Sequence, residues 1–170
     1  MIKKIDQKIF LAMYNFTVSH ERISKLAVFI TKFSSKFFSL IYLTVGGWLL
    51  YNNDFRLRSF ILIPAVVYLT VKLIPLLYNR RRPFAEQNFK NLVKQREDHS
   101  FPSTHAGSSM IISLVFLNIS FTLGSLMIFL AVLTALSRIM VGVHYPTDII
   151  GAWILALILY FTGVYIFLGI

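Results

Sequence analysis

The chain contains no cysteine, and only seven of its 170 residues are aspartate or glutamate. The lack of cysteine excludes a disulfide framework, a thiol nucleophile and a thiolate metal site. Charged residues of both signs make up 14% of the sequence, too few for an ordinary soluble domain. Hydrophobic residues make up 56%, and the mean hydropathy is +0.69. This composition is typical of an integral membrane protein.

Positive charge is abundant and unevenly placed. Seventeen lysines and arginines give a net charge of +10; seven of them precede residue 40 and six lie between Arg80 and Arg96. Such clusters suit anionic lipid headgroups or phosphorylated substrates. For the amino-terminal cluster, the positive-inside rule of membrane topology is a sufficient alternative. We expect no nucleic-acid partner, because the hydrophobic bulk leaves no soluble domain to carry a basic face.

The spacing of apolar residues predicts an all-α membrane protein. In 5–19 they recur at helical spacing, at Ile5, Ile9, Met13 and Phe16. This segment is typical of an amphipathic helix lying in the membrane interface, and we expect it to be retained because no cleavage site follows it. Spanning helices are expected at about 26–51, 57–78, 103–121 and 148–168, with another that follows a turn at 122–125 and ends near Val143. We therefore predict a single membrane-embedded domain over 1–170, built as a bundle of about five transmembrane helices plus an amino-terminal interfacial helix.

Three polar fragments punctuate these spans. They are Arg82-Pro83, then Pro102-Ser103-Thr104-His105, then Ser137-Arg138 followed by His144 and Asp148. Ionisable residues at membrane depth are costly, so each is a functional-site hypothesis. Counting the spans places all three fragments at the same membrane face, where we expect them to converge.

The arginines suggest phosphate binding. A guanidinium stays charged and donates two parallel hydrogen bonds, which suits the peripheral oxygens of a phosphoryl group. Arg82 and Arg138 are the candidates for this clamp, although Arg138 also fits a helix end whose carbonyls it would bind. We expect Arg80 and Arg81 to contact water or lipid headgroups, as charge runs beside a membrane usually do.

Ser103 and His105 open a predicted helix. Free N–H groups at a helix amino terminus bind anions, and the Ser103 hydroxyl would donate to a phosphate oxygen. The simpler alternative is that Ser103 is only an N-cap. His105 in the first turn would protonate a leaving oxygen as a general acid.

His144 and Asp148 are four residues apart, close enough to share one helical face. A carboxylate on one ring nitrogen fixes the tautomer and leaves the other nitrogen free to attack phosphorus. A competing interpretation makes His99, His105, His144 and Asp148 metal ligands, but no HExxH motif or acidic cluster supports it. We expect neither a metal nor another cofactor.

Together these fragments resemble the type 2 phosphatidic acid phosphatase family, whose site is shared with vanadium haloperoxidases and glucose-6-phosphatase. The family's third motif, Ser-Arg-x5-His-x3-Asp, matches completely from Ser137 to Asp148. In the second motif, Pro-Ser-Gly-His, Thr104 replaces glycine. In the first, Lys-x6-Arg-Pro, Pro75 stands where the family has lysine, and Lys72 lies one helical turn before it. We count Lys72 and Thr104 among the candidate phosphate-binding residues.

The resemblance implies a metal-independent phosphatase. It assigns His144 as nucleophile, Asp148 as its orienting partner and His105 as leaving-group acid, and it gives Arg82, Ser103 and Arg138 to the phosphate. Within the family the chain is most similar to the short bacterial undecaprenyl-diphosphate phosphatases linked to bacitracin resistance. That finer resemblance rests on five features: Ile9-Phe10, Phe29-Ile30-Thr31, the missing lysine, Arg82-Pro83-Phe84 and Ser100-Phe101-Pro102-Ser103.

Several alternatives stay open. The resemblance favours undecaprenyl diphosphate as substrate, but the motifs bind phosphate and not the tail, so a lipid A 1-phosphatase or a phosphatidylglycerophosphate phosphatase is the alternative. A non-catalytic phospholipid-binding or transport protein is the alternative of another class, although the inverted repeats common in transporters are not evident. The resemblance implies a bacterial cytoplasmic membrane and a site on the extracytoplasmic face, whereas the positive charge favours the cytoplasmic face. The sequence makes no prediction of lipid tail, phosphate number or oligomeric state.

Overall fold

A computed structural model describes residues 2–87 and 89–169, and every regular element in these two ranges is a helix. In chain order the helices are α1 (Ile2–Ser19), α2 (Glu21–Tyr51), α3 (Leu57–Leu77), α4 (Pro83–Gln87), α5 (Thr104–Leu117), α6 (Phe121–Met140) and α7 (Pro146–Leu168). Four of them, α2, α3, α6 and α7, are long and apolar enough to cross a membrane. The prediction of an all-helical membrane bundle is confirmed.

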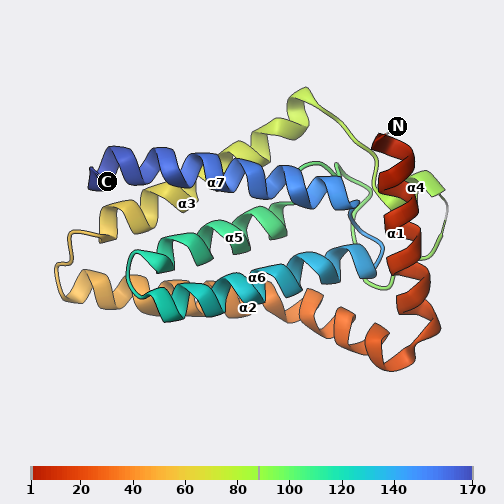
Figure 1. The fold of residues 1–170 in the computed structure, drawn as a ribbon, viewed down its shortest axis with the longest axis horizontal. Coiled ribbons are helices and arrows are strands. Elements are labelled where there is room, and N and C mark those ends of the chain that lie inside the picture. The colour runs from red at the N-terminus through yellow and green to blue at the C-terminus, as the bar shows by residue number, and fades with distance from the viewer. Residues whose placement is uncertain (1, 88, 170) are drawn as a thin grey trace.

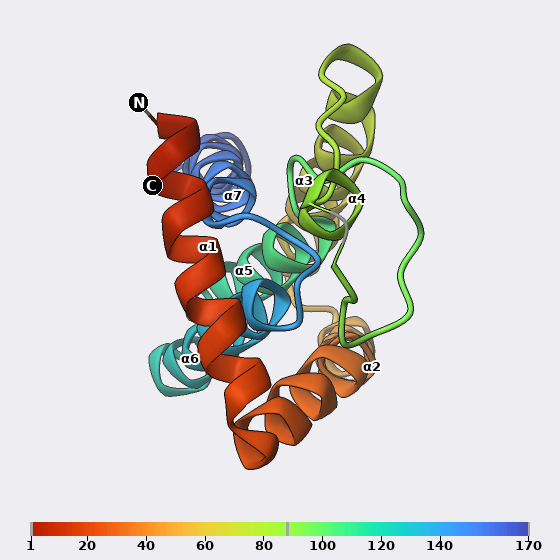
Figure 2. The same ribbon diagram turned by 90° about the vertical axis from the view of Figure 1, so that its right-hand side faces the viewer.

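The third expected span is a shorter helix than the sequence suggested. α5 has only 14 residues, and it ends at Leu117 instead of near residue 121. Ser120 then caps α6 by accepting a hydrogen bond from Leu123 N at 3.4 Å. A Cβ at Gly124 would come within 2.6 Å of Leu117, so glycine permits this close helix turn. Figure 2 shows α5 in the middle of the bundle, where it packs on α3, α6 and α7.

The amino-terminal helix lies across one end of the bundle. In Figure 1, α1 runs crosswise to the long helices, beside the end of α6 and the start of α7. Ile5 and Ile9 on its apolar face are exposed, whereas Phe10 is fully buried against the ring of Tyr145, with centroids 5.3 Å apart. This placement agrees with a helix that lies in the interface and packs on the bundle with its other side.

The long polar stretch after α3 passes over the same end. It contains the short helix α4, which the sequence did not predict, and a loop that sweeps between the ends of α3 and α2 (Figure 2). Leu92 N donates to Val141 O at 3.0 Å, which fastens the loop beside the α6–α7 connection. α1, this loop and the ends of the long helices therefore enclose one polar region.

Candidate active site

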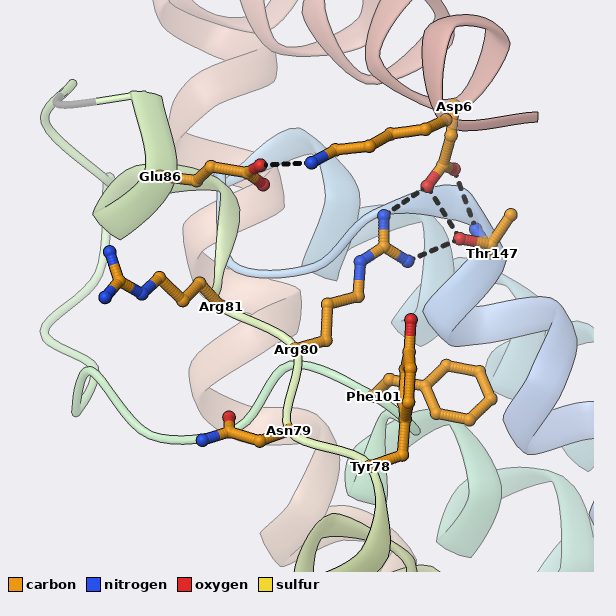
Figure 3. A pocket seen from close by; sticks show the side chains of 9 residues that line it. Asp6, Tyr78, Asn79, Arg80, Arg81, Glu86, Phe101 and Thr147 are labelled. Carbon is orange, nitrogen blue, oxygen red and sulfur yellow. Dashed lines mark hydrogen bonds and ion pairs between the residues drawn. The ribbon is translucent and has the colours of Figure 1, made fainter. Parts of the chain in front are cut away.

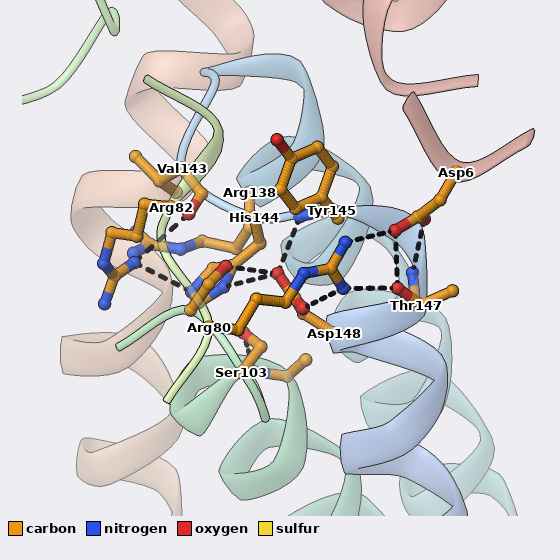
Figure 4. A network of polar contacts seen from close by, with 12 residues as sticks. Asp6, Arg80, Arg82, Ser103, Arg138, Val143, His144, Tyr145, Thr147 and Asp148 are labelled. Atoms are coloured by element: carbon orange, nitrogen blue, oxygen red, sulfur yellow. Dashed lines mark hydrogen bonds and ion pairs between the residues drawn. The ribbon is translucent and has the colours of Figure 1, made fainter. Parts of the chain in front are cut away.

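The structure brings the three polar fragments together at the bundle end crossed by α1, as predicted. Arg82 comes from the loop after α3, Ser103 caps α5, Arg138 lies in the last turn of α6, and His144 precedes α7 (Figure 4). Arg82, Ser103, Arg138, His144 and Asp148 are all less than 7% exposed. His105 is partly buried in the first turn of α5.

His144 is held between an acid and a guanidinium. Gly142 adopts a positive φ of 88°, which turns the chain sharply after α6 and precedes His144 by two residues. The ring then places Nδ1 3.5 Å from Asp148 Oδ2 and Nε2 3.2 Å from Arg82 Nη1. Because a guanidinium can only donate, Nε2 must be the unprotonated nitrogen, and Nδ1 carries the proton toward Asp148.

Burial keeps the His144 ring neutral. Loss of solvent lowers its pKa to about 4, and the nearby cations Arg82 and Arg138 add to this, against the opposing effect of Asp148. At neutral pH the ring therefore offers a lone pair on Nε2, directed toward the arginines. A neutral imidazole in this tautomer is a competent nucleophile.

Asp148 is fixed by its place in the first turn of α7. One carboxylate oxygen, Oδ2, accepts a hydrogen bond from Tyr145 N at 2.8 Å, as in a capping box, and another from the Ser100 hydroxyl. Its backbone oxygen accepts from Ser103 N at 3.1 Å, which ties the start of α5 to the start of α7. The carboxylate is fully buried and cannot swing away from His144.

Arg80 corrects an expectation. We expected it to meet water or headgroups, but its side chain is only 16% exposed. Its guanidinium donates to Asp148 Oδ1 at 2.8 Å, to Thr147 Oγ1 at 2.6 Å and to Asp6 Oδ2 at 2.6 Å (Figure 4). Asp6 in turn accepts from Thr147 N at 3.0 Å. We call Asp6, Arg80, Thr147 and Asp148 the carboxylate network.

The adjacent arginine behaves as expected. Arg81 is exposed and points away from the carboxylate network (Figure 3). A cavity of about 750 Å³ lies between the two arginines and α1, and neither His105 nor His144 lines it. This cavity is therefore separate from the candidate nucleophile.

We call Arg82 and Arg138 the arginine pair; Arg82 has partners in Asp98, Val143 O and His144 Nε2, whereas Arg138 is less completely satisfied. Arg82 Nε donates to Asp98 Oδ1 at 2.8 Å, but the Asp98 side chain is half exposed. Arg138 donates to Gln95 Oε1 at 3.2 Å, and its buried Nε finds no hydrogen-bond partner among the described residues. Buried donors without acceptors are rare in proteins and point to a function.

Ser103 is the N-cap of α5, which was the simpler of its two predicted roles. Its hydroxyl accepts a hydrogen bond from Ala106 N at 3.4 Å. Thr104, His105 and Lys72 line a second cavity of about 330 Å³ that opens between α2, α3 and α5. The three other candidate residues thus lie on one side of the arginine pair, toward the membrane interior.

The structure does not support the competing interpretation in which histidines and Asp148 bind a metal. Within 2–87 and 89–169, no three histidine or acidic side chains cluster in a way that would hold a metal ion. His99 instead contacts the Asn79 side chain at 2.7 Å on an exposed part of the loop. The donor groups around His144 are arginines, which suit an oxyanion.

Sequence reasoning missed Asp6, Arg80, Ser100 and Thr147. A weak signal existed for Asp6, since Asp6, Phe10 and Thr17 share one helical face and all are buried. That face is distinct from the exposed one of Ile5, Ile9 and Phe16, on which the interfacial-helix prediction rested. A buried acid beside buried aromatic residues requires a cationic partner, which Arg80 provides.

The model of the PAP2 superfamily matches residues 56–169. This chain belongs to the PAP2 superfamily. Undecaprenyl-diphosphatase BcrC of Bacillus subtilis (strain 168) is 31% identical over 159 residues, which cover 92% of this chain and 81% of that protein. The expected family is therefore confirmed, and the similarity to BcrC extends over most of the chain.

Two solved structures share the fold. A transmembrane PAP2-type phosphatidylglycerolphosphate phosphatase from Bacillus subtilis superposes with a TM-score of 0.80 at 23% identity, over 99% of this chain and 87% of that one. LpxE of Aquifex aeolicus gives a TM-score of 0.75 at 20% identity, over 93% of both chains. The chain thus shares its fold with both proteins, the first of which is a transmembrane PAP2-type protein.

Proposed function

We propose that this protein is a lipid phosphatase that removes the terminal phosphate of undecaprenyl diphosphate through a phosphohistidine intermediate. The observation that carries the proposal is the His144 ring, with Nδ1 facing Asp148 and Nε2 facing Arg82. The 31% identity to a protein named undecaprenyl-diphosphatase supports the choice of substrate. Catalysis and substrate binding are assigned to one membrane-embedded domain.

In the first step, His144 Nε2 attacks the terminal phosphorus. An N–P bond forms, the bond from phosphorus to the bridging oxygen breaks, and the electron pair stays on that oxygen. His105 donates a proton to it, so that lipid monophosphate departs. Asp148 holds the imidazolium that forms when Nε2 becomes phosphorylated, because its carboxylate faces the Nδ1–H.

In the second step, water attacks the phosphohistidine. The new O–P bond displaces Nε2, inorganic phosphate leaves, and the neutral His105 takes the proton of the water. Two displacements replace one difficult displacement, which is the advantage of a covalent intermediate.

The arginine pair holds the transferred phosphate. Arg82 and Arg138 supply the positive charge and the donors for its peripheral oxygens, including the unpartnered Arg138 Nε. The first N–H groups of α5, after Ser103, and the Thr104 hydroxyl add further donors at a helix amino terminus. Asp98 must release Arg82 when phosphate binds.

The decisive experiment measures phosphate release in the presence of EDTA from purified wild type, His144→Ala and His99→Ala. His144→Ala should lower turnover by about 10⁴-fold or more, because the nucleophile is lost. His99→Ala, at an exposed histidine in the loop before α5, should retain this turnover. Turnover by His144→Ala would contradict the mechanism. Loss of wild-type turnover in EDTA, together with loss of turnover in His99→Ala, would contradict it as well.

A substrate panel separates the candidate lipids. Undecaprenyl diphosphate should be the best substrate among undecaprenyl diphosphate, phosphatidylglycerophosphate, phosphatidic acid and lipid A. A non-catalytic binding or transport protein would release phosphate from none of them.

The proposed site faces the extracytoplasmic side of a bacterial cytoplasmic membrane. The buried roles of Arg82 and Arg138 support this, because two basic residues of this face serve the site and are not topology signals. The natural lack of cysteine makes the test direct. Lys90→Cys should be labelled in intact cells by an impermeant maleimide, and Asn52→Cys at the opposite bundle end only after permeabilisation; the reverse pattern would place the site inside.

A further inference from the structure

We call the cavity beyond His105 the polar cavity, because hydroxyl side chains are frequent in its lining. Of the twelve residues that line its volume of about 330 Å³, seven are serine or threonine: Ser34, Ser35, Ser39, Thr104, Ser108, Ser109 and Thr134. Only Phe38 and Ile112 are wholly apolar. Hydroxyl groups and a lysine in one cavity suit a ligand that includes an anionic group, because such a ligand offers them hydrogen-bond partners.

Lys72 provides the cation of this cavity. It lies in α3, three residues before Pro75, so it is deeper in the bundle by about 4.5 Å than the family's lysine position. Its side chain is exposed, its ammonium has no carboxylate partner among the described residues, and it lies 5.6 Å from the centroid of the Tyr68 ring. An accessible lysine without a counter-ion in an apolar helix is available to an anionic ligand.

Ser34 adds an independent signal. Its side chain lines the same cavity, and its buried Oγ has no hydrogen-bond partner among the described residues. Most serines in a membrane helix satisfy themselves by donating to a backbone oxygen one turn earlier, as Thr134 does here. The free hydroxyl of Ser34 therefore matches Lys72 as a donor for a ligand.

His105 connects this cavity to the arginine pair. It lines the cavity together with Lys72, and it also lies within electrostatic range of Arg82, Arg138 and His144. A phosphoryl group held by the arginine pair would thus have its leaving oxygen at His105. The group attached to that oxygen would enter the polar cavity.

We propose that this cavity binds the second phosphate of a diphosphate, the one that stays on the lipid. This inference rests on the proposed function and deepens it, since it makes Lys72, with the surrounding hydroxyls, the determinant of diphosphate over monophosphate. Lys72 neutralises the charge that develops on the departing lipid monophosphate while His105 protonates the bridging oxygen. Lys72 does not take the place of the family lysine at the transferred phosphate.

The surroundings of the cavity fit such a ligand. Ser34, Phe38 and Thr134 also line an adjacent apolar groove, whose other residues are Phe29, Ile30, Phe33, Phe37, Leu130 and Leu133. The order of environments is therefore arginine pair, polar cavity and apolar groove. It follows the order of terminal phosphate, second phosphate and hydrocarbon in a lipid diphosphate.

The test compares farnesyl diphosphate with farnesyl monophosphate, which share a tail and differ by one phosphate. The variant is Lys72→Met, and the matched control is Lys36→Met, a lysine of α2 that does not line the cavity. Lys72→Met should lower kcat/KM for the diphosphate by about tenfold to a hundredfold, the effect of losing a charged hydrogen bond. In the same variant, kcat/KM for the monophosphate should change by less than about twofold.

Vanadate provides a second readout, because it mimics only the transferred phosphoryl group. Its inhibition constant should be unchanged in Lys72→Met, and Lys72→Arg should recover part of the diphosphate activity. Equal losses for both substrates, no loss, or weaker vanadate inhibition would overturn the proposal; Lys72 would then hold the transferred phosphate or contact headgroups. Phosphate release that survives in His144→Ala would instead refute the proposed function.

Discussion

The groups that flank the two sides of the His144 ring differ in how fully they are hydrogen-bonded. On the Nδ1 side, Asp6, Arg80, Thr147 and Asp148 bond to one another within 2.6–3.0 Å, although His144 Nδ1 itself stands 3.5 Å from Asp148 Oδ2 and makes no hydrogen bond. On the Nε2 side, Arg138 Nε lacks a partner among the described residues, and Arg82 is paired with the half-exposed Asp98. The first side resembles a finished structural core, and the second presents donors directed at a ligand.

This difference separates stability from catalysis. Buried ion pairs that are fully bonded hold a fold in one arrangement, and breaking them is costly. Buried cations without counter-ions lower stability and are retained only where a function requires them. We therefore expect substitutions on the two sides of His144 to have opposite signatures.

The largest effect on stability is expected from Arg80→Met. This change leaves the buried carboxylates of Asp6 and Asp148 without their cation, which should lower the free energy of unfolding by about 3–5 kcal/mol. Arg81→Met, at the exposed neighbouring arginine, should change it by less than about 0.5 kcal/mol. Thermal unfolding in detergent measures both; equal effects would contradict the structural role of the carboxylate network.

A substitution in the arginine pair should lower activity without lowering stability. Arg138→Met removes a buried cation and an unpartnered donor, so the unfolding midpoint should stay the same or rise. Phosphate release should fall by about 10²- to 10³-fold, the cost of losing one oxyanion donor. A clear fall in stability together with the loss of activity would remove the distinction between the two sides.

The pH dependence of stability tests the neutral ring. The His144 pKa is about 4 in the folded protein and 6.5 as an ordinary histidine, so the unfolded chain binds more protons between these values. The stabilisation by neutral His144 is present above pH 6.5 and is lost as the pH falls toward 4, with a slope of at most about 1.4 kcal/mol per pH unit. His144→Asn should lack this slope in unfolding midpoints measured from pH 7 to pH 4; parallel curves would contradict the assignment.

The smallest effect is expected at Asp98. Its carboxylate pairs with the buried Arg82 guanidinium, but the Asp98 side chain is itself half exposed, so solvent screens the pair. Asp98→Asn should lower KM by about two- to fivefold, because phosphate no longer competes with a carboxylate. Glu97→Gln, the adjacent exposed acid, is the control, and a higher KM in Asp98→Asn would show that Asp98 instead positions Arg82.

The parts of the site that the sequence predicted are those encoded by local spacing. His144 and Asp148 are separated by one helical turn, and Ser103 and His105 open a helix; such relations hold wherever the segment lies. The helices were predicted because lipid requires long apolar runs. α5 was predicted too long because its turn into α6 depends on packing at Leu117 and Gly124.

The sequence by itself determined that this is a membrane-embedded protein with an arginine and histidine motif suited to phosphate, because composition and short-range spacing are properties of the chain alone. Only the tertiary structure decided that Arg80 is buried while Arg81 is exposed, and that Asp6 reaches Asp148 through Arg80 across 142 positions of sequence. Arg80 and Arg81 are adjacent and of the same type, so the sequence alone does not distinguish them. Their environments differ only when α1 packs across the bundle end, since burial and charge pairing depend on what lies opposite each side chain.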